Sequence, residues 1–266
     1  MLLDFDKLGV WKWMLVAICT LMVLFLLLPI LFIVALSFGS SRWLIFPPPD
    51  WTLKWYGELF ADPRWLGAAL TSAKIGVIVM VLSVVLGLLA SLALVRGKFR
   101  GRAVLRAFFL TPMVLPVVIV AVALYAAFLR LGLNGTLTGF VIAHLIVALP
   151  FAIITISGAL ETFDPAIEDA AILCGASPWE ARLRITLPGI RHGMFSAAIF
   201  SFLISWDEVV LAIFMASPSL QTLPVKVWTT LRQDLTPVIA AASTLLVALT
   251  VLLMIAAALI RKGKTQ

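Results

Sequence analysis

Long apolar segments, separated by short polar ones, run through the whole chain. A helix needs about 20 residues to cross a hydrocarbon core of about 30 Å, and six of the apolar segments reach that length. They cover residues 14–38, 68–95, 108–129, 137–160, 194–216 and 239–260. The pattern therefore predicts an all-α, polytopic membrane protein with six transmembrane helices, organised as a single domain over residues 1–266.

The composition supports a membrane environment. The chain is 63% hydrophobic and only 12% charged, which would leave a soluble domain with more apolar surface than it can bury. The segment that follows Lys7 and Lys12 is too long for a signal peptide and has no small-residue cleavage site, so we expect it to stay as a span. Cys19 lies in an apolar segment and Cys174 in a predicted loop, which indicates neither a disulfide nor a metal site.

The basic residues indicate the orientation of the spans. Thirteen of the 20 lysine and arginine residues lie in segments that share one side if six spans cross the membrane; six lie on the other side, and Lys74 lies within the second span. Basic residues concentrate on the cytoplasmic side of membrane proteins. We therefore expect both termini and segment 161–193 in the cytoplasm, and segments 39–66 and 217–237 on the outer side of the membrane.

Several residues predict local features of the spans and the outer segments. Pro112, Pro116 and Pro150 remove backbone hydrogen bonds inside spans, so we expect kinks there. Gly87 and Ser91 are small enough to let two helices approach closely. Segment 39–66 is rich in tryptophan, which is typical of a membrane interface, and segment 217–237 either folds back onto the membrane or forms a gate.

Two short helices are predicted in the cytoplasmic segment 161–193. Asp164 and Pro165 form a typical helix start, and Gly175 suits the left-handed residue that ends a helix, so the first helix covers about 165–173. Ser177 and Glu180 form a capping box, which predicts a second helix from 178 to about 184. Capped helices alone occur in many loops, so the spacing of the motif decides what this one is.

That spacing resembles the inner-membrane permeases of bacterial ATP-binding-cassette importers. Their loop motif reads E-A-A, three residues, glycine, nine residues and I-x-L-P. The chain has Asp169-Ala170-Ala171, then Gly175 after three residues, and Ile185-Thr186-Leu187-Pro188 after nine more. Aspartate replaces the usual glutamate, with Glu168 directly before it, so the charge is kept with a shorter reach.

The resemblance implies a type I ABC importer permease fold and a set of partners. These are a second permease subunit, two ATPase subunits that hold ATP and Mg, and a periplasmic solute-binding protein. The chain has no phosphate-binding glycine loop, so we expect no cofactor on it and no enzymatic activity of its own. The resemblance places the ATPase-coupling role on Glu168, Asp169, Ala170, Ala171, Gly175, Ser177, Trp179, Ile185, Leu187 and Pro188.

The fifth predicted span contains two acids near its middle, Asp207 and Glu208, at a cost of about 2.5 to 3.5 kcal/mol for an acid at that depth. On a continuous helix, Ser201, Ser205 and Glu208 would share one stripe, and Asp207 would face about 100° away. Each acid is expected either to contact substrate or to pair with a basic group, such as Lys74 or one on another subunit. His144, in the fourth span, is expected to form an interhelical hydrogen bond.

Most of the chain resembles the second permease of spermidine/putrescine-type importers. The matching residues are Thr52-Leu53-Lys54-Trp55-Tyr56, Leu149-Pro150-Phe151, Ser205-Trp206-Asp207-Glu208-Val209-Val210 and Leu223-Pro224-Val225-Lys226. The resemblance implies that Ser205, Asp207, Glu208 and Trp55 handle a cationic amine, through carboxylate pairing and a cation-π contact. Val117 follows Pro116 where those permeases often have an acid, so an opine or amino-acid-like solute stays an alternative to a polyamine.

Two other classes of protein fit part of the pattern. A proton-coupled secondary carrier would explain the acids of the fifth span but not the cytoplasmic motif. An intramembrane hydrolase would need its two acids to face each other from separate helices, and Asp207 and Glu208 are adjacent on one. The sequence therefore favours a permease subunit that forms half of an amine translocation pathway.

Overall fold

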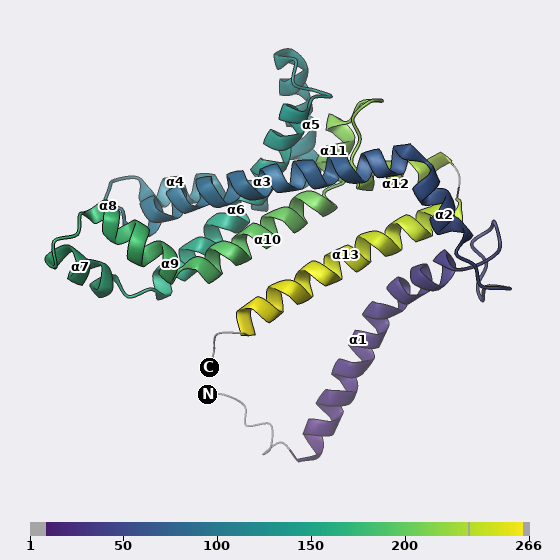
Figure 1. The fold of residues 1–266 in the computed structure, drawn as a ribbon, viewed down its shortest axis with the longest axis horizontal. Helices are drawn as coiled ribbons and strands as arrows, with labels where there is room; N and C mark the ends of the chain where they lie inside the picture. The colour runs from purple at the N-terminus through teal and green to yellow at the C-terminus, as the bar shows by residue number, and fades with distance from the viewer. Residues whose placement is uncertain (1–8, 234, 263–266) are drawn as a thin grey trace. The chain divides into compact units, whose positions relative to one another are not determined.

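The computed structural model describes residues 9–233 and 235–262, and its regular structure is helical (Figure 1). Lys7 and Lys264, which count toward the predicted orientation, lie outside the described residues. In chain order the helices are α1 (Val10–Ser37), α2 (Lys54–Ala61), α3 (Pro63–Arg96), α4 (Arg102–Val114), α5 (Val117–Leu131), α6 (Leu137–Thr162), α7 (Pro165–Leu173), α8 (Pro178–Ala181), the π-helix η2 (Arg182–Thr186), α9 (Leu187–Gly189), α10 (Arg191–Asp207), α11 (Val210–Met215), α12 (Leu223–Gln233) and α13 (Pro237–Lys262).

The helices confirm the all-α membrane fold. Within the described residues, four helices are long and apolar enough to cross a membrane, namely α1, α3, α6 and α13. Two bent pairs bring the number to six if each pair is one span: α4 with α5, bent by 102°, and the helical stretch from α8 to α9 with α10, bent by 68°. The bend between α4 and α5 falls at a predicted kink. Pro116 precedes α5, and Leu115 before it is extended, as expected of a residue that a proline follows.

The chain packs as two compact units. The first contains Met1–Asp62 and Thr230–Ala248, and the second contains Pro63–Thr229 and Leu249–Gln266. This division concerns contacts alone, so the single permease domain over 1–266 stays a prediction.

In the first unit, the segment between α1 and α2 folds back on itself. Gly39 and Trp51 form an isolated antiparallel bridge, and the indole Nε1 of Trp55 donates to the Gly39 carbonyl at 2.6 Å. Trp43 and Trp51 leave 70% and 69% of their surface exposed. Their exposed rings suit the membrane interface that the sequence predicts for this segment.

The second unit is built on three helices, α3, α6 and α10, which pack side by side (Figure 1). Small residues bring α3 and α6 together, as the sequence predicts. A Cβ on Gly87 would lie 3.0 Å from the side chain of Ala152, and the Ser91 hydroxyl donates to the Ile153 carbonyl at 3.1 Å. Ser157 of α6 in turn donates to Ser91 at 3.1 Å. These contacts let the two backbones approach more closely than larger side chains would allow.

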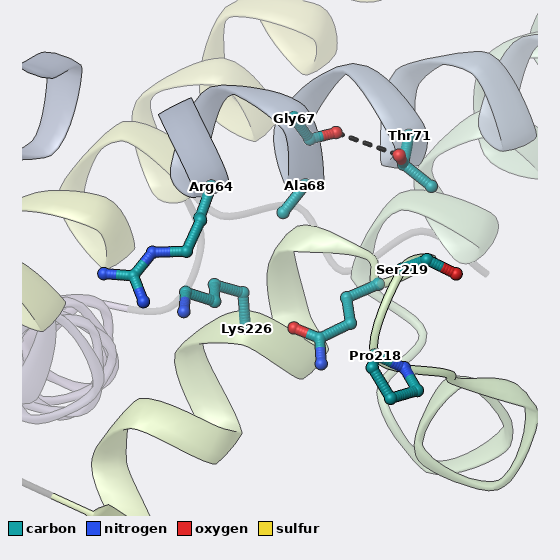
Figure 2. A pocket seen from close by; sticks show the side chains of 8 residues that line it. Arg64, Gly67, Ala68, Thr71, Pro218, Ser219 and Lys226 are labelled. Atoms are coloured by element: carbon teal, nitrogen blue, oxygen red, sulfur yellow. Dashed lines mark hydrogen bonds between the residues drawn. The ribbon is translucent and has the colours of Figure 1, made fainter. Parts of the chain in front are cut away.

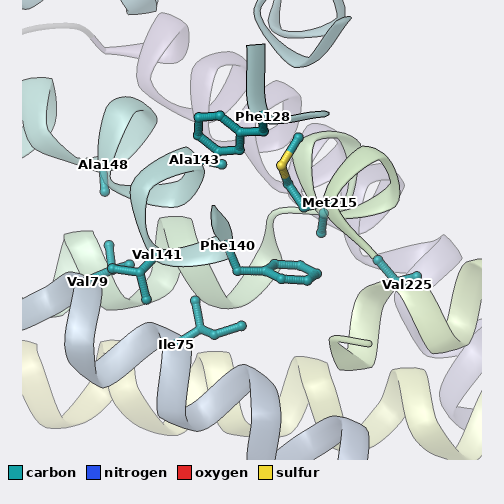
Figure 3. Packing of buried hydrophobic residues seen from close by; sticks show 10 residues of the cluster. Ile75, Val79, Phe128, Phe140, Val141, Ala143, Ala148, Met215 and Val225 are labelled. Atoms are coloured by element: carbon teal, nitrogen blue, oxygen red, sulfur yellow. The ribbon is translucent and has the colours of Figure 1, made fainter. Parts of the chain in front are cut away.

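A buried apolar cluster joins this three-helix core to the shorter helices (Figure 3). Ile75 of α3 and Phe140 of α6 are fully buried in it, together with Met215 of α11. Phe128 of α5 and Val225 of α12 close the cluster. The cluster therefore fixes α5, α11 and α12 at one end of the core, whereas Figure 1 shows α7, α8 and α9 at the other end.

Candidate functional site

The motif of segment 161–193 folds as two capped helices, as its sequence predicts. The side chain of Asp164 accepts a hydrogen bond from the N–H of Ala166 at 2.9 Å and caps α7. Gly175 follows α7 with φ of 96°, a left-handed conformation that suits glycine. The Ser177 N–H donates to the Glu180 carboxylate at 3.1 Å, and the Glu180 N–H donates to Ser177 Oγ at 3.3 Å. This confirms the capping box at the start of α8.

The second helix of the motif is longer than predicted. It does not end near Arg184: α8 continues as the π-helix η2 and then as α9, which ends at Gly189. The physical reason is that no glycine or proline interrupts residues 181–187, so no residue there favours a helix end. The helical stretch therefore reaches as far as α10, from which it is separated by the 68° bend.

The two neighbouring acids of the motif have different surroundings. Glu168 is buried, and its carboxylate accepts from Arg182 Nε at 3.3 Å and from the Thr186 hydroxyl at 2.9 Å. Asp169, on the next position of α7, is exposed. The sequence placed both acids in the coupling set but did not reveal Thr186 or the internal role of Glu168. The opposite charges of Glu168 and Arg182 on two short helices were the available signal.

The remaining predicted coupling residues are either exposed or half-buried. Trp179 has 57% of its surface exposed, and Leu173 beside the motif glycine has 88%. Exposed members of the predicted set are Asp169, Ala170, Gly175, Ser177, Trp179 and Pro188, while Ala171, Ile185 and Leu187 are half-buried. The motif thus presents apolar and charged groups outward, as a surface that binds another protein does.

The segment in which the motif leads into α10 packs tightly against the end of α6. A Cβ on Gly189 would overlap the ring of Phe163, and a Cβ on Gly193 would overlap the side chain of Ala159. Arg96, in the last turn of α3, donates from Nη2 to the carbonyls of Leu160 at 3.2 Å and Phe163 at 2.9 Å. A guanidinium suits these carbonyls, since the C-terminal carbonyls of a helix lack intrahelical partners. The ends of α3, α6 and α10 therefore meet beside the motif.

The acids of the fifth span lie at a helix break, which corrects the prediction of one continuous helix over 194–216. Helix α10 ends at Asp207, and Glu208 has an extended backbone before α11 begins at Val210. Glu208 consequently shares no helical stripe with Ser201 and Ser205. Its carboxylate instead accepts from the Leu211 N–H at 2.9 Å, and this bond to a free N–H of α11 stabilises the break.

The groups around the break differ in accessibility. Asp207 is exposed and Glu208 half-buried, whereas Ser205 is buried and lies 2.9 Å from Nδ1 of His144. The predicted interhelical role of His144 is thus confirmed. Within the described part of the second unit, Lys74 is exposed and forms no ion pair with either acid.

Trp55, the fourth predicted substrate residue, belongs to the first unit and has its own local environment. Its ring is buried, and Lys54 Nζ lies 5.0 Å from the ring centroid. Lys54 also pairs with Glu58 at 3.6 Å. Trp55, Lys54 and Glu58 line a pocket of about 370 Å³ together with Ser40, Arg42, Thr236 and Val238. A cation already occupies the neighbourhood of the ring that the sequence assigns to an amine.

A larger pocket, of about 420 Å³, lies at the opposite end of α3 from Arg96 (Figure 2). Arg64 and Thr71 of α3 line one side, and Ser219, Gln221 and Lys226 line the other. The two sides are tied together by the buried bond from the Leu223 N–H to Ser72 Oγ, at 2.8 Å. From the sequence, Arg64 and Lys226 are expected only as basic residues of the outer segments, and their position in one pocket is not predicted.

Comparisons with known proteins agree with the motif. Residues 83–265 match the family described as the binding-protein-dependent transport system inner membrane component. The spermidine/putrescine transport system permease protein PotC of Escherichia coli K12 is 30% identical over 245 residues, which cover 91% of each chain. The putrescine transport system permease protein PotI of the same strain is 33% identical over 230 residues, which cover 84% of this chain and 81% of PotI.

Solved structures show the same fold. A chain of a bacterial alginate ABC transporter, in complex with an alginate pentasaccharide-bound periplasmic protein, has a TM-score of 0.75 at 15% identity. The match covers 99% of this chain and 97% of that one. A second structure of a bacterial ABC transporter, one that imports alginate, gives a TM-score of 0.73 at 16% identity, with 97% and 98% covered. The chain therefore belongs to the family of inner membrane permease components of binding-protein-dependent ABC importers.

Proposed function

We propose that the chain forms half of the translocation pathway of an ATP-driven importer for a small organic amine, namely a polyamine such as putrescine or spermidine. The observation that carries the solute class is the identity of about a third to permeases of spermidine and putrescine systems over 84% to 91% of the chain. The exposed carboxylate of Asp207 at the α10 break supports it, since a carboxylate pairs with an ammonium group.

The other half of the pathway belongs to a second permease subunit, and two ATPase subunits bind ATP and Mg. The surface around Asp169 and Trp179 docks onto one ATPase, so the segment 161–193 lies in the cytoplasm. A periplasmic solute-binding protein delivers the amine at the opposite face. The binding-protein complex of the alginate transporter, which shares the fold, supports this arrangement.

The transport cycle follows from this arrangement. Closure of the ATPases around ATP moves the docked motif, and the motif leads through η2 and α9 to α10 across the 68° bend. Because α10 ends at the acids, its movement changes access to Asp207 and Glu208. ATP binding and hydrolysis thus shift the population between outward-open and inward-open states.

Uptake into vesicles that contain the complete transporter tests the proposal. We expect labelled putrescine or spermidine to accumulate in an ATP-dependent way that survives a protonophore. Uptake that fails with protonophore and survives ATP depletion would instead establish a secondary carrier. Competition by unlabelled polyamines, opines and amino acids identifies the solute class, and competition by opines or amino acids alone would exclude a polyamine.

A further inference from the structure

We infer that Glu168 is the positioning residue that transmits movement from the docked motif to α10, a role that rests on the proposed function. Its carboxylate joins α7 to η2 at two points. Oε1 accepts from Arg182, the first residue of η2, and Oε2 accepts from Thr186, the last. One side chain on α7 thereby holds both ends of the π-helical turn.

The two hydrogen bonds of Glu168 form a tie between α7 and η2, and the burial of this tie distinguishes it from a surface contact. Thr186 is fully buried and Glu168 is 8% exposed, while Ala181 just before η2 is 1% exposed. The ion pair with Arg182 is partly shielded, with 39% of the arginine side chain and 11% of the glutamate side chain exposed. Charged hydrogen bonds that exclude water are stronger than exposed ones, so this contact holds α7 and η2 as one body.

An ionised carboxylate suits both contacts and adds a charge that an amide lacks. Arg182 Nε and the Thr186 hydroxyl are both donors, and an ionised carboxylate offers one accepting oxygen to each. A glutamine could still accept from Arg182 and donate its NH₂ group to the Thr186 hydroxyl, but it would lose the charge of the ion pair with Arg182. An aspartate would have to reach both donors with one methylene less.

The geometry also separates the two acids of the motif by task. Adjacent positions of an α-helix point about 100° apart, so Glu168 faces η2 while Asp169 faces outward. Asp169 is the acid available to the ATPase, and Glu168 keeps α7 attached to the stretch that leads into α10. Without these contacts the ATPase would still bind α7, but the movement of α7 would not be transmitted to η2, α9 and α10.

Limited trypsin digestion of the complete transporter in membrane vesicles tests the tie directly, by cleavage after Arg184. We expect Glu168→Ala to be cut about tenfold faster than the wild type, the factor that corresponds to losing a charge-assisted hydrogen bond, with Glu168→Gln in between. Glu161→Gln, an exposed acid next to the motif, is the matched control and should be cut at the wild-type rate. Glu168→Gln, nearly the same in shape, keeps the test valid if Glu168→Ala fails to fold.

The reciprocal variant removes the same contacts from the other side. Arg182→Met combined with Thr186→Val should be cut as fast as Glu168→Ala. Adding Glu168→Ala to that pair should change the rate little, because groups that share one interaction are not additive. Additive effects would contradict the tie.

Coupling is read from solute uptake per ATP hydrolysed, with labelled putrescine as the probe. In Glu168→Ala we expect the ATPase subunits to remain attached and to hydrolyse ATP, while uptake per ATP falls about tenfold. Cleavage at the wild-type rate, or unchanged uptake per ATP, would overturn the inference. Failure of the wild-type chain to retain any ATPase would instead refute the proposed function, and the trypsin result would still decide the tie.

Discussion

Ser205 of α10 and His144 of α6 share a hydrogen bond of 2.9 Å between Oγ and Nδ1, inside the three-helix core. Their exposed fractions are 3% and 0%. Because Ser205 lies two residues before Asp207, this bond fixes the end of α10 from which the exposed acid projects. Ser205 is thus enclosed by protein, and its hydroxyl serves to hold the helix end.

Removing that bond should loosen the core. We expect Ser205→Ala to lower the free energy of unfolding by about 0.5 to 1.5 kcal/mol, the range for hydrogen bonds between membrane helices. His144→Ala should cost more, because it also leaves a cavity in place of a fully buried ring. Unfolding in mixed detergent micelles, followed by circular dichroism, measures the change. Thr155→Val, which removes a hydroxyl on the exposed face of α6, is the control and should have a smaller effect. Equal effects at 144 and 155 would contradict a special role for the buried bond.

The contact between α10 and α6 depends on Gly193. A methyl group there would overlap Ala159, so Gly193→Ala should destabilise the protein by about 1 to 3 kcal/mol, the cost of overpacking. Gly158, on α6, has nothing within 4 Å of an added Cβ. Gly158→Ala should therefore be neutral or stabilising by up to about 1 kcal/mol, as alanine favours a helix. Thermal unfolding of the purified complex compares the stabilities of the two variants. A Gly193→Ala protein more stable than the Gly158→Ala protein would contradict the close contact between Gly193 and Ala159.

Arg96 should matter more than the basic residues that follow it. Arg96→Ala loses both bonds to the end of α6, and we expect a loss of about 1.5 to 3 kcal/mol, typical of hydrogen bonds from charged groups. Arg96→Lys keeps the charge but not the fork-shaped donor, so it should recover part of the loss. Arg100→Ala, at an exposed position, is the control. An Arg96→Ala protein as stable as the Arg100→Ala protein would refute the capping role.

The two acids at the α10 break should respond differently to loss of charge. Asp207→Asn should lower the uptake rate about tenfold with the assembly intact, because a charge-assisted bond to the amine is lost. Glu208→Gln keeps an accepting oxygen for the Leu211 N–H and should fold normally, whereas Glu208→Ala should cost about 1 kcal/mol of stability, like other lost caps. Uptake of labelled putrescine and thermal unfolding separate the two effects. Unchanged uptake in Asp207→Asn would remove that residue from the substrate site.

The sequence predicts most of the fold because its signals are local and strong. A run of about 20 apolar residues has few alternatives to a membrane helix, and the caps at Asp164 and Ser177 each satisfy a specific backbone N–H. Gly175 likewise occupies a backbone conformation that few other residues adopt. The positions of α7 and the start of α8 therefore follow from the residues themselves.

Features that depend on tertiary contacts could not be predicted in the same way. Residues 205–210 contain no glycine or proline, so nothing local indicates that α10 ends at Asp207. The pairing of Glu168 with Thr186 spans 18 positions and depends on the π-helical turn. The pocket between Arg64 and Lys226 requires α12 to be anchored on α3 by Ser72, a contact 151 positions apart in the chain.

Helix α3 has 34 residues and, at 1.5 Å per residue, a length of about 51 Å, against a hydrocarbon core of about 30 Å. If α3 lies near the membrane normal, about 20 Å of its length extends beyond the hydrocarbon core into headgroups or water. Arg96 donates hydrogen bonds to the C-terminal end of α6 beside the motif, and Arg64 lines the pocket at the other end of α3. Because α3 is one uninterrupted helix, a small rotation at its Arg96 end would be passed directly to its Arg64 end.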